Sequence, residues 1–116
     1  MTQRRQTGNA GESRAAAFLE RRGFVIVARN WSCRYGELDI VAERGETIVF
    51  VEVRVRKDAL DSARASIGAR KIARLTATAV CYLQEHRCED RDWRIDVVTI
   101  SGDHIEHIPH AIEDAD

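Results

Sequence analysis

The sequence predicts an α/β fold in which a small mixed β-sheet carries helices on its faces. Three features lead to this prediction. Residues 38–55 form two apolar runs around a bend that contains glycine, which is typical of a β-hairpin. Residues 9–22 and 69–86 have the composition or the spacing of helices. Further apolar runs of strand length lie at residues 24–28 and 93–100.

Length and composition are those of one folded domain. A chain of 116 residues can bury roughly two thirds of its unfolded surface. We expect a disordered tail at residues 1–8, the domain at 9–112 and a frayed acidic end at 113–116. No apolar run reaches the length of a signal peptide or a membrane span, so we expect no membrane partner. The three cysteines lack close paired spacing, which favours a reducing cytoplasm over a disulfide framework.

The first helix is expected from Asn9 to about Arg22, because alanines are frequent there and Gly23 supplies a stop. Asn9 and Glu12 also fit an N-terminal capping pair. After it we expect a strand at 24–28 and then a loop that leads into the hairpin.

Beyond the hairpin, residues 57–71 are expected to hold a loop or a short helical turn. A longer helix follows at 69–86, and strands follow at 93–100 and 104–108. Asp96 lies inside the first of these strands. No spacing ties it to the hairpin, so we expect it to pair with a basic group such as that of Arg94 rather than to act in catalysis.

The hairpin carries acids where a core strand normally has none. With the bend at residues 44–45, Asp39 is expected opposite Phe50 and one diagonal step from Glu52. Side chains alternate along a strand, so three polar residues share the face of Asp39: Glu52, Arg54 and Arg56. The other face is expected to be core, formed by Leu38, Ile40, Val49, Val51, Val53 and Val55.

Two buried carboxylates need a partner, because an unpaired buried charge is costly. The oxygen atoms of Asp39 and Glu52 suit Mg²⁺ or Mn²⁺, which keeps several waters for a substrate phosphate. A neighbouring cation on the same strand could then offset charge on the phosphoryl group. The alternative is a structural ion pair of one acid with Arg54 or Arg56, and spacing alone does not separate the two interpretations.

The segments GELD at 36–39 and FVEVRVR at 50–56 resemble the G-E-hydrophobic-D … F-V-E-V-K pattern of the YraN-like family of small bacterial proteins. That family resembles a minimal PD-(D/E)xK nuclease, close to the archaeal Holliday-junction resolvases. The similarity extends over nearly the whole chain, at Gly11-Glu12, Leu19, Gly23-Phe24, Arg29-Asn30, Ile67, Lys71, Leu75, 94–98 and 107–111. The resemblance implies a restriction-endonuclease-like fold, metal ligation by Asp39 and Glu52, and a supporting acid at Glu12.

Arg54 occupies the position of the superfamily's lysine, and there the sequence departs from the pattern. Arginine stays protonated and cannot act as a base, but it can bind phosphate through two hydrogen bonds. Lys71 lies in the first turn of the second helix, where free amides attract phosphate, and the family pattern favours a place near the scissile phosphate. Three other candidate phosphate contacts are Arg29, Arg34 and Arg56.

The charge is unevenly distributed along the chain, although its net value is −1. Residues 1–84 carry 15 Lys/Arg against 9 Asp/Glu, and residues 85–116 carry 3 against 10, so the two parts have charges of +6 and −7. This segregation favours one basic surface and an acidic end.

These features together predict a metal-dependent endonuclease that hydrolyses phosphodiester bonds in DNA, at branched or otherwise irregular structures. By analogy with the resolvases, it would act as a homodimer. The catalytic residues expected are Asp39, Glu52, Arg54 and Glu12. Two alternatives stay open. One is a nucleic-acid-binding module on a nuclease fold that has lost its chemistry, and the other is an adaptor whose acidic C-terminal third docks a protein partner.

Overall fold

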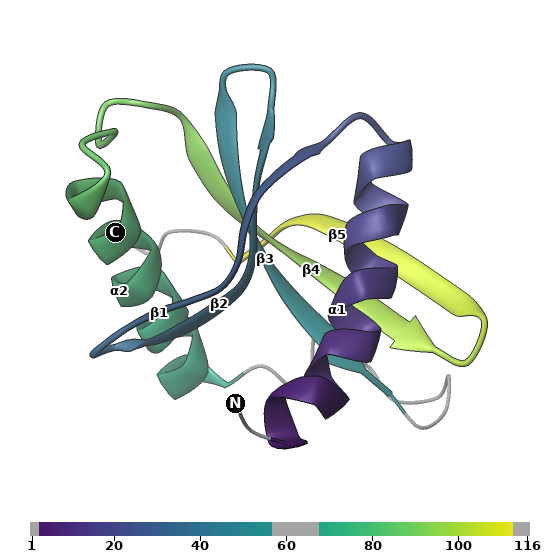
Figure 1. Cartoon of the computed structure of the whole chain (residues 1–116). Helices are drawn as coiled ribbons and strands as arrows, with labels where there is room; N and C mark the ends of the chain where they lie inside the picture. Colours follow the sequence, from purple (N-terminus) through teal and green to yellow (C-terminus); the bar gives the residue numbers. More distant parts are fainter. Residues whose placement is uncertain (1–2, 57–67, 113–116) are drawn as a thin grey trace.

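The computed structural model describes residues 3–56 and 68–112 (Figure 1). Its elements are α1 (Gln3–Arg21), β1 (Val25–Cys33), β2 (Gly36–Arg44), β3 (Thr47–Val55), α2 (Ala69–Glu85), β4 (Trp93–Ser101) and β5 (His104–Ile112). The loop or turn expected at 57–71 lies outside the described residues up to position 67, and so does the acidic end at 113–116. Within the described ranges, neither helix is both long and apolar enough to cross a membrane.

The five strands form one mixed sheet in the order β1-β2-β3-β4-β5. Every neighbouring pair is antiparallel except β3 and β4, which run parallel. A parallel pair needs a long crossover connection, and α2 lies within it. Figure 1 shows α1 and α2 on opposite sides of the sheet. The predicted α/β class with a small mixed sheet flanked by helices is therefore confirmed.

The face of the sheet under α1 is apolar because alternate residues of the central strands point toward the small side chains of the helix. The apolar cluster between α1 and the sheet contains the buried residues Ala15, Ala16, Leu19, Phe24, Ile40, Ala42, Val49, Val51, Val98 and Ile100. Gly11 allows the helix to approach β3, since a Cβ at this position would lie 2.9 Å from Val55 Cγ2. A larger residue there would push α1 away from the sheet.

The opposite face packs against the apolar stripe of α2, whose buried residues recur at helical spacing. This second cluster contains Leu38, Val41, Ile48, Phe50, Leu75, Ala79, Tyr82, Leu83, Ile95 and Ile112. The prediction that Leu38 shares the core face of Ile40 is thus wrong. Leu38 packs instead in the cluster under α2, and in the neighbouring strand Asn30, between the partners of Ile40 and Leu38, has a left-handed φ of 57°. Val55 was also expected in the core, but as the last residue of β3 it is 67% exposed.

Two boundaries differ from the prediction. Helix α1 begins at Gln3 rather than at Asn9, so residues expected in a disordered tail are helical and position 9 lies inside the helix instead of at its start. Glutamine and arginine have good helix propensity, which lets the first turns extend in the N-terminal direction. Strand β1 continues to Cys33, so the expected loop at 29–32 is a strand, because this segment pairs with β2 as far as Cys33 and Gly36.

Asp96 forms a structural network, as predicted. Its side chain is fully buried, and its oxygens lie 3.0 Å from Arg94 Nε and 2.8 Å from His107 Nε2. The backbone N–H of His110 donates to Oδ1 at 2.9 Å. Burial by itself would raise the pKa of Asp96, but the hydrogen bonds from His107, His110 and Arg94 outweigh it and lower that pKa. The network joins β4 to β5 where their register shifts, between Ile95 and Val97.

Candidate active site

The turn between β2 and β3 sets the register of the acids. The strands pair Ile40 with Val51 and continue to Arg44 with Thr47, so the turn is formed by residues 45–46. The predicted turn at residues 44–45 is therefore off by one position, and the pairing of Asp39 with Phe50 is wrong. Extending the observed register brings Asp39 level with Glu52. Gly45, with a φ of 62°, takes the first position of the turn, where positive φ suits a two-residue hairpin.

The side chain of Asp39 is held by the neighbouring strand. The backbone N–H of Val53 donates to Asp39 Oδ2 at 2.8 Å, just beyond the last paired residues of β2 and β3. Burial and then the charge of Glu52 raise the pKa of Asp39 to about 7, against the effect of the Val53 hydrogen bond. The pKa therefore reports two carboxylates close together in a partly dehydrated place.

Glu52 is buried and has a cation beside it. Lys71 Nζ lies 2.8 Å from Glu52 Oε2, and the exposed fractions of the two side chains are 48% and 8%. Lys71 comes from the first turn of α2, a helix that packs mainly against β2. A carboxylate this deeply buried needs such a charge, because ionisation without a partner would cost several kcal/mol.

The acids open into a cavity of about 440 Å³ between the hairpin and α2. It is lined by Gly36, Glu37, Asp39, Glu52, Arg70, Lys71, Arg74, Leu75 and Thr78. Three acidic and three basic side chains thus face one space. The sequence reasoning missed Glu37, Arg70 and Arg74 as lining residues. A signal was present for Glu37, which is two positions before Asp39 and so on the same side of a strand.

Gly36 closes one end of the cavity. A Cβ at this position would lie 3.1 Å from Thr78 Oγ1, and the φ of Gly36 is 156°. Thr78 in turn donates to the carbonyl oxygen of Arg74 at 2.7 Å. The glycine of the GELD segment therefore lets β2 approach α2 at the place where the acids meet.

Glu12 lies outside this lining, on α1. It is buried, and its Oε1 atom has no hydrogen-bond partner within the described residues, although Arg29 Nη2 lies 3.7 Å away. Burial raises the pKa of Glu12, while Asn30 and Arg29 act to lower it. The charge of Glu12 also contributes to the raised pKa of Asp39. Glu12 is therefore near enough to act on the site electrostatically, and its supporting role stays a prediction.

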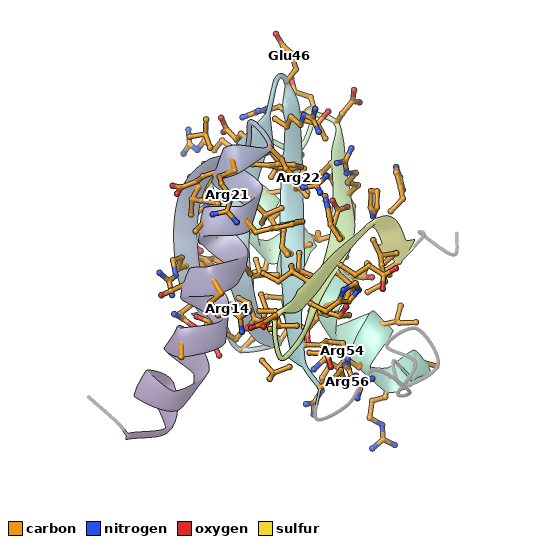
Figure 2. All side chains as sticks on the ribbon, turned by 90° about the vertical axis from the view of Figure 1, so that its right-hand side faces the viewer. Arg14, Arg21, Arg22, Glu46, Arg54 and Arg56 are labelled. Carbon is orange, nitrogen blue, oxygen red and sulfur yellow. The ribbon has the colours of Figure 1, made fainter. Side chains whose placement is uncertain are left out.

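The other predicted basic residues are not brought to the cavity. Arg54 and Arg56 lie together near the end of β3, as Figure 2 shows. Arg29 contacts Glu12 and donates to Ser13 Oγ at 3.1 Å. Arg34 is exposed in the turn between β1 and β2, where it donates to the hydroxyl of Tyr35. Their roles as phosphate contacts stay predictions.

The donor chemistry of the site fits a hard divalent ion. Asp39 and Glu52 both line the cavity with carboxylate oxygens, which are the ligands that Mg²⁺ and Mn²⁺ prefer. In residues 3–56 and 68–112, no group of three acidic, histidine or cysteine side chains is close enough to enclose a metal. Of the residues that the structure describes, Asp39 and Glu52 are the two that would hold such an ion.

The mixed sheet with a helix on either face has the fold of a resolvase-like nuclease. The structure of Hjc, a Holliday junction resolvase from Archaeoglobus fulgidus, matches it with a TM-score of 0.56. The match covers 88% of this chain and 76% of that chain, at 21% sequence identity. At this identity the likeness concerns the fold, and it confirms the expected restriction-endonuclease-like architecture.

Sequence comparison places the chain more closely. The model of a family described as "Uncharacterised protein family UPF0102" matches residues 11–100. A UPF0102 protein of Chloroflexus aurantiacus is 48% identical over 102 residues, covering 87% of this chain and 83% of that protein. Another, from Roseiflexus castenholzii, is 47% identical over 124 residues, covering 99% and 100%. The chain belongs to the UPF0102 family, which is the YraN-like family that its motifs resemble.

Proposed function

We propose that the protein is a Mg²⁺- or Mn²⁺-dependent endonuclease that hydrolyses phosphodiester bonds in DNA. The observation that carries this proposal is the convergence of Asp39 and Glu52, from adjacent strands, in a cavity that also contains three basic side chains. The raised pKa of Asp39 supports it, since such shifts gather at functional sites. The likeness of the fold to a Holliday junction resolvase supports branched DNA as the substrate.

In this proposal Asp39 and Glu52 hold the ion, which when bound polarises the phosphodiester and lowers the pKa of a water molecule. The Val53 N–H keeps the Asp39 carboxylate in place. Lys71, Arg70 and Arg74 attract the DNA backbone to the mouth of the cavity. Arg54 contacts a phosphate from the end of β3 but cannot accept a proton, and Glu12 supports the site electrostatically.

Two further parts of the proposal concern its setting. A branched DNA presents two strands to be cut, so the protein would act as a homodimer with one site in each copy. DNA as the substrate, with three cysteines that are free thiols, fits an activity in the cytoplasm. Light scattering of the purified protein would test the homodimer. Immunodetection in cell fractions would test the cytoplasmic location.

The direct test is cleavage of a labelled four-way DNA junction in Mn²⁺. We expect nicking by wild type and a loss of at least about a hundredfold in Asp39→Asn and Glu52→Gln, the scale of removing an interaction made in the transition state. The matched control is Glu43→Gln, which changes an acid on β2 that pairs with Arg91 at 3.0 Å and does not line the cavity. Cleavage that persists in both site variants would exclude the proposed catalytic pair.

Arg54 motivates a second candidate, a DNA-binding module on the same fold without chemistry. Its distinguishing result is salt-dependent junction binding by wild type without cleavage, together with cleavage by Arg54→Lys. Cleavage by wild type would exclude it. Failure to bind DNA even at low salt would exclude both candidates and leave the protein-adaptor interpretation.

A further inference from the structure

The ion pair between Lys71 of α2 and Glu52 of β3 joins an exposed side chain to a buried one. The carboxylate belongs to the central strand β3 and is 8% exposed, whereas the ammonium comes from α2 and is 48% exposed. The lysine therefore reaches into the cavity from its solvent side. It has a flexible four-carbon stem and carries a compact, well-hydrated charge, so it can change partner without moving the helix.

A second acid, Asp39, lies level with Glu52 on the neighbouring strand. Burial and then the charge of Glu52 raise the pKa of Asp39, and Glu52 itself contacts one ammonium, that of Lys71. A divalent ion bound by both carboxylates would compensate them better than a single positive charge. An ion held by Glu52 would compete with Lys71 for this carboxylate.

A released ammonium would then meet like charges. Arg70 and Arg74 line the same cavity as Lys71, so three cations, with Glu37 as the one further acid of the lining, would face one space next to a bound dication. Like charges at this range repel unless an anion lies between them. A DNA phosphate at the mouth of the cavity supplies such an anion, and it can bind all three side chains.

We propose that Lys71 and a divalent cation compete for Glu52, and that a DNA phosphate takes over Lys71 when the cation binds. This inference rests on the proposed function, and it assigns Lys71 a role in coupling metal to DNA. The lysine closes the metal site in the absence of DNA, and metal and DNA each strengthen the binding of the other. Because such a coupling is a property of the equilibrium, it must appear equally in both titrations.

The first measurement is Mn²⁺ binding alone, by calorimetry at constant ionic strength. We expect Lys71→Met to bind Mn²⁺ about fivefold more tightly than wild type, which corresponds to the roughly 1 kcal/mol of a partly exposed ion pair. Lys71→Arg keeps the charge and should stay within about twofold of wild type. The matched control is Arg74→Met, which removes a cation of the same cavity and should also change affinity by less than about twofold.

The second measurement is the affinity of a four-way DNA junction with and without Mn²⁺, by fluorescence anisotropy in the cold, with the DNA recovered to verify that it is intact. We expect Mn²⁺ to strengthen junction binding by wild type about fivefold. DNA that binds Lys71 removes the same competition for Mn²⁺ as Lys71→Met does, and Mn²⁺ must strengthen DNA binding by the factor by which DNA strengthens Mn²⁺ binding. The junction affinity of Lys71→Met should be nearly unchanged by Mn²⁺. Circular dichroism of each variant verifies folding, which a half-exposed position on a helix should tolerate.

The outcomes separate this inference from the proposed function. If wild type and Lys71→Met bind Mn²⁺ equally, the competition is excluded while the metal site stands. If Arg74→Met tightens binding as much as Lys71→Met, the effect is that of the general field, and the specific exchange is excluded. If no variant binds Mn²⁺, the inference and the proposed metal-dependent function both fail.

Discussion

The N–H of Val53 donates to Asp39 Oδ2 over 2.8 Å, so the strand that carries Glu52 also holds the carboxylate that faces it. This hydrogen bond comes just past Ile40 and Val51, where the pairing of β2 with β3 stops. The carboxylate of Asp39 thus accepts a hydrogen bond from a backbone N–H of β3 that lies beyond the last paired residues of the two strands. The two acids are fixed relative to one another by the backbone of β3 rather than by mobile side-chain contacts.

The first prediction concerns the free energy of unfolding without metal. Asp39→Asn should be more stable than wild type in EDTA by about 1 kcal/mol, because the amide removes the repulsion by Glu52 and its oxygen can still accept from Val53. Added Mn²⁺ should stabilise wild type but not the variant, since a ligand stabilises only the protein that binds it. Urea titration measures both. A variant less stable than wild type in EDTA would show that the acids do not oppose each other.

The second prediction concerns acid unfolding. The folded-state pKa of Asp96 is lowered, so its stabilising contribution is full above the unfolded pKa of about 3.8 and is lost as pH falls through the lower folded value. Asp96→Asn should cost about 3–5 kcal/mol at pH 7, the range for removing one partner of a buried ion pair. It should also flatten the loss of stability below pH about 4. Denaturant titrations at several pH values decide this, and an unchanged acid slope would contradict it.

The third prediction concerns the approach of β2 to α2. Gly36→Ala should destabilise the protein by about 1–3 kcal/mol, because its Cβ would meet Thr78 Oγ1 at 3.1 Å and its φ is positive. Gly68→Ala is the control, since no atom of the residues that the structure describes lies within 4 Å of its Cβ position and its φ is −81°. Thermal unfolding distinguishes them. If Gly36→Ala and Gly68→Ala had equal melting temperatures, β2 and α2 could move apart without loss of stability, which would contradict the prediction.

The fourth prediction concerns DNA affinity. Arg70→Gln and Arg74→Gln should each weaken junction binding and lower the slope of log affinity against log salt by about 1, as expected for one lost phosphate contact. Arg21→Gln serves as the control, because Arg21 is an exposed residue of α1, outside the cavity (Figure 2). Anisotropy titrations over a range of salt concentrations measure the slopes. If Arg70→Gln, Arg74→Gln and Arg21→Gln all had the same salt slope, the DNA would not bind at the cavity.

Much of the site followed from local pattern. Strand alternation placed Asp39 and Glu52 on one side of the hairpin. This prediction holds although the turn was misplaced, because the observed register changes the residue opposite Asp39 from Phe50 to Glu52. A shift of two residues along a strand leads to the same face of the sheet. Helical spacing located α2. The lack of spacing between Asp96 and the hairpin favoured an ion pair with a basic group, and the contact of Asp96 with Arg94 confirms this pair.

The sequence by itself determined the sheet, the two helices and the shared face of the acids, since these depend on periods of two and 3.6 residues within one segment. Only the tertiary structure decided what faces those acids. The contact of Lys71 with Glu52 and the cavity between them arise because α2 crosses back over the sheet between parallel strands. The spacing of residues within a segment does not predict how far one element lies from another. That distance is set by packing between elements, as where the absence of a side chain at Gly36 leaves room for Thr78.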